Sequence, residues 1–273
     1  YCAGLAQEAK GTTIPMGPGL FNYTLREPLG VVARLGAYNH PLMFAVARTA
    51  AALAAGNAVV VKPPETSPLS AMILAEIAQQ ALPAGLFNVI TGEGRTAGDA
   101  LVRHPLVKRI AFIGSPATGR AIQRAAAEVA VKHVTLELGG KNPLVAFPDA
   151  DPEAVADAAI RGMNFAWQGQ SCGSTSRLLL HEDIHDRVLP LVVDKVKAIR
   201  LGDPQDAATG MGPVNSRMQY EKVLAYFDAA RADGARLVAG GRRPTGPGFE
   251  RGYWVEPTVY ADVRPGMRIW QEE

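Results

Sequence analysis

The chain has 273 residues, of which 48% are hydrophobic and 20% charged, as in an ordinary globular protein of one or two domains. Its 28 Lys and Arg residues nearly balance 26 Asp and Glu residues, for a formal net charge of +2. This balance gives no reason to expect nucleic acid or a membrane as a partner, so we expect a small-molecule partner.

Strands and helices are expected to alternate through the first half of the chain. Residues 10–28, rich in Pro and Gly, come first and predict a β-arm. Strands are then expected at 31–35, 57–62, 86–91, 109–114 and 133–138, and helices at 41–56, 68–82, 96–104 and 116–130. This alternation predicts βαβ units and a parallel sheet with helices on both faces. Ser67, Ser115 and Asp151 each precede a proline, which predicts three capped helix starts.

A second α/β unit is expected after a joint near Gly139 and Gly140. It starts with a helix from Pro152 and continues through a polar loop that contains Cys172. A strand at 177–180, a long helix through 199, a helix at 217–233 and short strands near 237 and 259 follow. The predicted fold class is therefore α/β with two successive units.

Apolar stretches, cysteine content and the two ends of the sequence bear on where the protein is located and whether the sequence is complete. The apolar stretch 45–61 is interrupted by polar residues and predicts no membrane span, and we expect no secretory leader. Only Cys2 and Cys172 occur, without a CxxC pair, which favours a reducing, cytoplasmic setting and no bound metal. Because the sequence starts at Tyr1 and stops at Glu273, we expect a segment of a longer protein.

Three local motif matches lack the context that their chemistry needs. HEDIH at 181–185 matches a zinc-protease pattern, but His181 ends an apolar strand and no third His follows. GEGRTA at 92–97 fits a loose dinucleotide fingerprint but lacks the acid expected about 20 residues later, so a plain turn is equally favoured. A papain-type reading of the cysteine loop would put Thr175 at the nucleophile position.

Three residues form a more coherent set. Asn39 lies between an expected strand and helix, where its amide suits an oxygen that acquires negative charge, although a turn Asn explains it too. Glu137 ends an apolar strand, a buried position that suits a general base or a carboxylate that caps the following turn. Cys172 is either a nucleophile or a small residue that fits its loop.

Five motifs in order and spacing resemble the aldehyde dehydrogenase superfamily. They are GAYNHP (36–41), VVVKPPE (59–65), FIGSPATG (112–119), LELGGK (136–141) and GQSC (169–172). The resemblance covers essentially the whole chain, and the terminal QEE resembles the start of the family's EEIFGP motif. It implies a Rossmann-like parallel-sheet cofactor domain followed by a catalytic α/β domain, each incomplete at one end.

The resemblance implies three domain ranges and an oligomer. Residues 1–28 would be an N-terminal stub and the β-arm of the oligomerisation region, 29–139 the NAD-binding domain, and 140–273 the catalytic domain. The family is homodimeric or homotetrameric, so a homo-oligomer is expected for the full-length protein.

The resemblance also implies the catalytic roles. Cys172 would attack an aldehyde, and the Asn39 amide and the Cys172 N–H would hold the oxyanion. After hydride transfer to the nicotinamide, water activated by Glu137 would hydrolyse the thioester to the carboxylic acid.

The cofactor is expected to be NAD, with NADP possible. Lys62 and Glu65 match the positions that hold the adenosine ribose, where a carboxylate repels a 2′-phosphate. Gly114, Ser115 and Gly119 match the phosphate loop at a helix N-terminus. The remaining expected cofactor contacts are Gly94, Leu138 and Glu273, the last at the nicotinamide ribose.

Departures from the family pattern bear on the substrate. Tyr38 stands where Trp is common, Ala37 replaces Pro, and His40 intervenes before Pro41. Two alternatives to an acid-forming enzyme are open: a CoA-acylating aldehyde dehydrogenase, against which Glu137 argues, and a non-catalytic protein that kept the fold.

Overall fold

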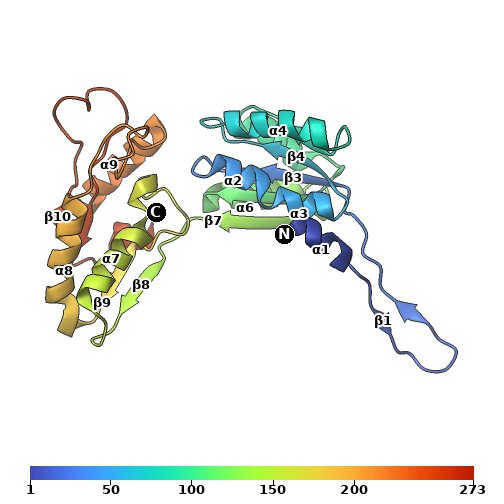
Figure 1. Cartoon of the computed structure of the whole chain (residues 1–273), viewed down its shortest axis with the longest axis horizontal. Helices are drawn as coiled ribbons and strands as arrows, with labels where there is room; N and C mark the ends of the chain where they lie inside the picture. Colours follow the sequence, from blue (N-terminus) through green and yellow to red (C-terminus); the bar gives the residue numbers. More distant parts are fainter. The chain divides into compact units, whose positions relative to one another are not determined.

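The structure, a computed structural model, describes all residues from Tyr1 to Glu273 (Figure 1). The chain divides into two compact units, Tyr1–Leu138 and Gly139–Glu273. We call them unit 1 and unit 2 and describe each by itself.

Unit 1 is built on the predicted parallel sheet of five strands, in the order β5-β4-β3-β6-β7. The strands are β3 (Val31–Leu35), β4 (Ala58–Lys62), β5 (Phe87–Val89), β6 (Val107–Gly114) and β7 (His133–Leu138). All pairings are parallel, so the carboxyl ends of all five strands lie along one edge of the sheet. The segments that follow the strands are therefore brought together at that edge.

Helices cover both faces of this sheet. They are α2 (Pro41–Val46), α3 (Thr49–Ala54), α4 (Leu69–Ala81), the π-type turn η2 (Gly94–Gly98), α5 (Asp99–Arg103) and α6 (Pro116–Ala127). On one face, α5 and α6 pack against Ala33 and Ile110, which are fully buried. On the other, α2, α3 and α4 pack against Val59 and Val61. Alternate residues of each strand thus bury apolar side chains in two separate layers.

The N-terminal residues of unit 1 form the predicted β-arm. After α1 (Cys2–Leu5) and the short turn η1 (Ala6–Glu8), strands β1 (Thr13–Ile14) and β2 (Asn22–Tyr23) pair as an antiparallel hairpin. Both strands are exposed throughout, so the hairpin buries no apolar side chain in unit 1.

Unit 2 has a small parallel sheet and a helical core. Strand β8 (Pro143–Ala146) pairs with β9 (Arg177–Leu180), and β10 (Arg236–Ala239) pairs antiparallel with β11 (Val259–Ala261). The helices are α7 (Pro152–Met163), the short turn η3 (Phe165–Trp167), α8 (Glu182–Lys197), α9 (Arg217–Ala232) and α10 (Arg268–Gln271). One stripe of α8, Ile184, Val188, Val192 and Val196, is buried at the four-residue spacing of a helix face.

Two local predictions need correction. The expected helix 41–56 is two helices, α2 and α3, separated by a turn at residues 47–48. Ser67 does not cap α4, because α4 begins at Leu69 and the Ser67 hydroxyl donates to the Tyr38 carbonyl oxygen at 3.3 Å. Ser115 and Asp151 do cap α6 and α7, accepting from Thr118 N and Ala154 N.

Candidate active site

The carboxyl edge of the unit 1 sheet holds the candidate residues of that unit. Asn39 follows β3, Lys62 ends β4, Gly94 follows β5 and Ser115 follows β6. Glu137 and Leu138 end β7. Each candidate lies within a few residues of a strand end because the motifs coincide with βα connections, where parallel α/β sheets bind ligands.

Lys62, Glu65 and Gly94 form one connected cluster. Lys62 is buried, and its Nζ lies 2.8 Å from Glu65 Oε1. The same oxygen accepts a hydrogen bond from Gly94 N at 2.6 Å. Although partial burial would raise the pKa of Glu65, the hydrogen bond and charge of Lys62 and the Gly94 N–H outweigh it and hold that pKa below its usual value. Glu65 thus ties the segment after β4 to the segment after β5.

Glu65→Gln is expected to lower stability at neutral pH but not at acidic pH. The folded protein holds the pKa of Glu65 down, so this contribution is present above the ordinary carboxyl pKa and is lost as pH falls through the folded value. Because the side chain is 49% exposed, the effect at pH 7 should be small, about 0.2–1 kcal/mol. Urea unfolding at neutral and acidic pH measures it, with exposed Glu76→Gln on α4 as the control. If wild type and Glu65→Gln differ in the free energy of unfolding by the same amount at both pH values, the lowered pKa of Glu65 does not contribute to stability.

The segment from Gly114 to Gly119 joins the end of β6 to the first turn of α6. The Ser115 hydroxyl accepts from Thr118 N at 3.3 Å and donates to Thr118 Oγ1 at 3.0 Å. A Cβ at Gly114 would collide with the Phe112 ring, so a side chain cannot be placed there without a shift. The N-terminus of this 12-residue helix is exposed and presents backbone N–H groups, an arrangement that suits a phosphate.

Gly119 and Leu138 contribute to packing under this helix. Gly119 is buried, and a Cβ there would meet Leu138 Cδ2 at 3.1 Å and Leu136 Cδ1 at 3.3 Å. The absence of a side chain lets α6 lie close to β7. Leu138 packs on the same core layer. In this structure both residues therefore set the position of the helix start.

Arg34 is a buried charge that the sequence analysis did not identify. It lies on β3, five residues before Asn39, and its Nε donates to the Phe44 carbonyl oxygen of α2 at 3.1 Å. Burial, followed by the charge of Arg48, lowers the Arg34 pKa to about 10, whereas the charge of Glu137 opposes that shift. Arg34 therefore fixes the helix that follows Asn39 and shares an electrostatic environment with Glu137.

Glu137 is exposed in this structure, so the expected burial was wrong. β7 is an edge strand, and its residues alternate between exposed and half-buried. Val134, Leu136 and Leu138 pack on the core layer beneath α6, which puts Glu137 on the opposite face. The carboxylate is therefore accessible to water.

Cys172 lies in the predicted loop of unit 2, between η3 and β9. Cys172 is half-buried, and the neighbouring Ser174 is buried. Ser174 N donates to the Ser171 carbonyl oxygen at 3.0 Å, which closes a tight turn around Cys172. The Asn142 amide donates to the carbonyl oxygens of Cys172 at 2.7 Å and Ser174 at 3.1 Å. The loop is thus ordered by side chains as well as by its own turn.

Glu273 lies beside the turn that opens unit 2. Its carboxylate contacts the position that a Cβ of Gly139 would occupy. Burial lowers the pKa of Lys141, while the charge of Glu273 opposes the shift and the charges of Arg177 and Lys222 reinforce it. Glu273 was expected from the resemblance to contact the nicotinamide ribose, whereas Lys141, the last residue of LELGGK, was not among the expected site residues.

The HEDIH match has no metal-site geometry. His181 precedes α8 as its N-cap, and its Nδ1 accepts from Asp183 N at 3.2 Å, whereas His185 lies inside the helix. The two His therefore do not share one helix, and no group of three or more His, Cys, Asp or Glu residues is arranged to hold a metal ion.

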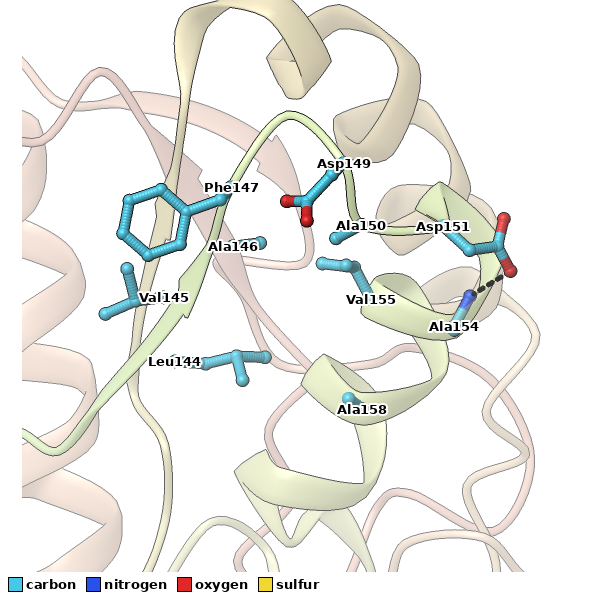
Figure 2. Close-up of a pocket in the computed structure, with 10 residues that line it drawn as sticks. All are labelled: Leu144, Val145, Ala146, Phe147, Asp149, Ala150, Asp151, Ala154, Val155 and Ala158. Atoms are coloured by element: carbon cyan, nitrogen blue, oxygen red, sulfur yellow. Dashed lines mark hydrogen bonds between the residues drawn. The ribbon is translucent and has the colours of Figure 1, made fainter.

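The surface has two open grooves, one in each unit. One, of about 360 Å³, lies in unit 2 between β8 and α7 (Figure 2). Its charged residues are Asp149 and Asp151, of which Asp151 caps α7 through Ala154 N, and it contains no candidate residue. The other, of about 580 Å³, is lined by α2, Ser70 of α4 and His40, the residue after Asn39. Only this second groove adjoins a candidate segment.

Comparison with known proteins gives one consistent result. The family model described as "Aldehyde dehydrogenase family" matches residues 1–273. Among curated proteins, aldehyde dehydrogenase tropH of Talaromyces stipitatus is 48% identical over 281 residues, covering 100% of this chain and 54% of that protein.

Solved structures agree with this match. PnpE from Pseudomonas sp. WBC-3, solved also in complex with nicotinamide adenine dinucleotide, has a TM-score of 0.96 and 43% identity, and the chain covers 56% of it. The NAD+ complex of an aldehyde dehydrogenase from Bacillus cereus has a TM-score of 0.95 and 39% identity, with 55% of it covered. The chain therefore spans about half the length of these relatives.

Proposed function

This chain belongs to the aldehyde dehydrogenase family, and on that premise we propose that it is part of an enzyme that oxidises an aldehyde to the carboxylic acid with NAD(P)+. The observation that carries the proposal is that Asn39, Glu137 and Cys172 occupy the family's motif positions together, on three segments far apart in the sequence. A protein that had kept only the fold would have no chemical reason to retain all three.

The proposed reaction begins at Cys172. Its thiolate attacks the aldehyde carbon, and the oxyanion of the resulting thiohemiacetal is stabilised by the Asn39 amide and the Cys172 N–H. NAD, when bound, supplies the acceptor of the hydride that leaves this carbon. Loss of this hydride from the oxyanion re-forms the C=O bond and leaves a thioester on Cys172, which has the oxidation level of the acid.

Hydrolysis of the thioester is assigned to Glu137. The carboxylate takes a proton from water as that water attacks the acyl carbon, which releases the acid and restores the thiol. The exposure of Glu137 supports this role, because a base that activates water must be reached by water.

The proposed cofactor residues fit a dinucleotide by their chemistry. Glu65 is a carboxylate held in place by Lys62 and Gly94, and it would accept from the ribose hydroxyls and repel a 2′-phosphate, which favours NAD over NADP. The start of α6 at Ser115 would hold the pyrophosphate. Glu273 is assigned to the nicotinamide ribose.

The groove on α2 and α4 supports an aldehyde with an apolar body. Leu42, Met43 and Val46 line it, directly after the segment that carries Asn39. These side chains are 50%, 52% and 41% exposed, so they offer apolar surface to a ligand.

Assembly and location are part of the proposal. We assign the protein to the cytoplasm as a homodimer or homotetramer, with the exposed β1–β2 hairpin as an oligomerisation arm. None of its helices is long and apolar enough to cross a lipid bilayer.

The reaction type is tested by NADH formation with aliphatic, aromatic and amino aldehydes, using the protein in its full natural length without coenzyme A. We expect NADH and an equal amount of carboxylic acid. Product only in the presence of coenzyme A, as a thioester, would instead indicate the CoA-acylating branch. No NADH with any aldehyde would indicate a non-catalytic protein.

A further inference from the structure

We propose that Asn142 is a positioning residue for Cys172, a role that rests on the proposed function. Asn142 lies immediately before β8, 30 residues from Cys172 in sequence. Its side-chain nitrogen donates to the Cys172 carbonyl oxygen at 2.7 Å and to the Ser174 carbonyl oxygen at 3.1 Å. An amide nitrogen has two hydrogens, so one side chain satisfies both carbonyls.

The two bonds matter because the loop has no strand beside it. The chain between η3 and β9 has no ladder partner until Arg177. Its backbone groups must therefore bond to side chains, to the loop itself or to the preceding helix α7. Ser174 N bonds within the turn, and Thr175 N donates to the Gly162 carbonyl oxygen at 2.8 Å. Asn142 supplies the side-chain donors for the carbonyls on either side of Gly173.

The peptide plane that follows Cys172 is held at both of its ends. Its carbonyl oxygen accepts from Asn142, and its N–H, on Gly173, donates to Ser171 Oγ at 3.3 Å. Gly173 has no side chain and is exposed, so nothing else on that residue restricts the plane. Fixing this plane restricts the ψ angle of Cys172 and so the direction of its Cα–Cβ bond, which carries the sulfur.

Asn142 is itself fixed by the sheet of unit 2. Its carbonyl oxygen accepts from Arg177 N at 3.2 Å, directly next to the first residue pair of β8 and β9. Because the Asn142 backbone is bonded to this ladder, its side chain holds the cysteine loop in a fixed position relative to strands β8 and β9. Asp at this position has the same shape but presents oxygens to the two carbonyls, so both bonds would be replaced by repulsion.

The test uses Asn142→Asp and Asn142→Ala in a Glu137→Gln background, in the full-length protein. In that background thioester hydrolysis is slow, so NADH formed in the first turnover reports acyl formation at Cys172. The amplitude of the NADH burst gives the number of active sites that can react. Its rate constant reports how well the Cys172 sulfur is positioned in those sites. We expect an amplitude close to that of the background protein, a rate constant about 10- to 100-fold lower, and an unchanged KM for NAD.

Asn88→Asp is the matched control. Asn88 Nδ2 also donates to two backbone carbonyls, of Gly85 at 2.8 Å and Val59 at 3.3 Å, and it lies on β5 of unit 1, whereas the cysteine loop belongs to unit 2. It is expected to leave the rate constant unchanged while it lowers the melting temperature, as loss of such bonds should.

Three outcomes would overturn the proposal. An unchanged rate constant in both Asn142 variants would show that the loop needs no such support. A reduced amplitude with a normal rate constant in the remaining sites, complete loss of the amplitude, or protein that does not fold would show a purely structural role. If the Glu137→Gln background protein, in which Asn142 is unchanged, forms no NADH, the proposed function is wrong, and the role of Asn142 that rests on it is wrong too.

Discussion

Cys172→Ser is expected to abolish aldehyde oxidation while the protein stays folded. A serine hydroxyl is almost entirely protonated near neutral pH, and an ester passes its acyl group to water less readily than a thioester. Loss of the attacking nucleophile lowers kcat by on the order of 10³- to 10⁶-fold in enzymes that use covalent catalysis. The loop should keep its shape, because Asn142 bonds the Cys172 carbonyl oxygen, which serine retains. NADH formation measures the loss, and circular dichroism and the melting temperature report the fold.

The second cysteine provides the control for this experiment. Cys2 lies on α1, in the other unit, and Cys2→Ser should keep wild-type turnover. Substantial turnover by Cys172→Ser would contradict the assignment of the nucleophile. Loss of turnover in Cys2→Ser would show that activity depends on thiol chemistry outside the loop.

Glu137→Gln is expected to spare the first turnover and slow the later ones. Gln has nearly the same shape but cannot accept a proton, so acyl formation proceeds and thioester hydrolysis loses its base. General-base catalysis typically contributes about 10²- to 10⁴-fold, which sets the expected fall in steady-state rate. Rapid-mixing measurements of NADH should show a burst of about one equivalent per active site, followed by a slow phase.

Glu128, an exposed acid outside the candidate site, is a suitable comparison. It is exposed and pairs with Arg103 at 2.6 Å, at the end of α6 that is remote from Ser115. Glu128→Gln should keep the wild-type steady-state rate. An unchanged steady state in Glu137→Gln would remove Glu137 from its assigned role, and loss of the burst would place Glu137 in acyl formation.

The sheet and its helices were predictable because their signals are local. The valine-rich run from Ala58 to Lys62 identifies a buried parallel strand, and Ser115 before Pro116 identifies the start of α6. Ser67 before Pro68 looked the same in sequence. Its hydroxyl instead donates to the Tyr38 carbonyl oxygen, a tertiary contact across 29 positions that no local pattern reports.

The same distinction holds for the candidate site. Cys172 and Glu137 could be proposed as catalytic candidates because each lies in a motif, GQSC or LELGGK, that is a continuous stretch of sequence. Asn142 was not, because an Asn after a Gly-Gly-Lys turn has no local mark of a partner 30 residues away. Arg34 was missed for a similar reason, since a charge in an apolar strand can point to either face. Glu137 was expected to be buried, but it is exposed because β7 is an edge strand of the sheet. The order of the strands in a sheet cannot be deduced from the sequence of one strand.

The proposed mechanism requires that the sulfur of Cys172 becomes acylated by the carbonyl carbon of the aldehyde. It is tested most directly by acid-quenching full-length Glu137→Gln protein with NAD and an active aldehyde, followed by peptide mass spectrometry. We expect the peptide containing Cys172 to gain the mass of the acyl group, and hydroxylamine, which cleaves thioesters, to remove it. If NADH forms while Cys172 stays unmodified, or if the acyl group is found on another residue, Cys172 is not the nucleophile.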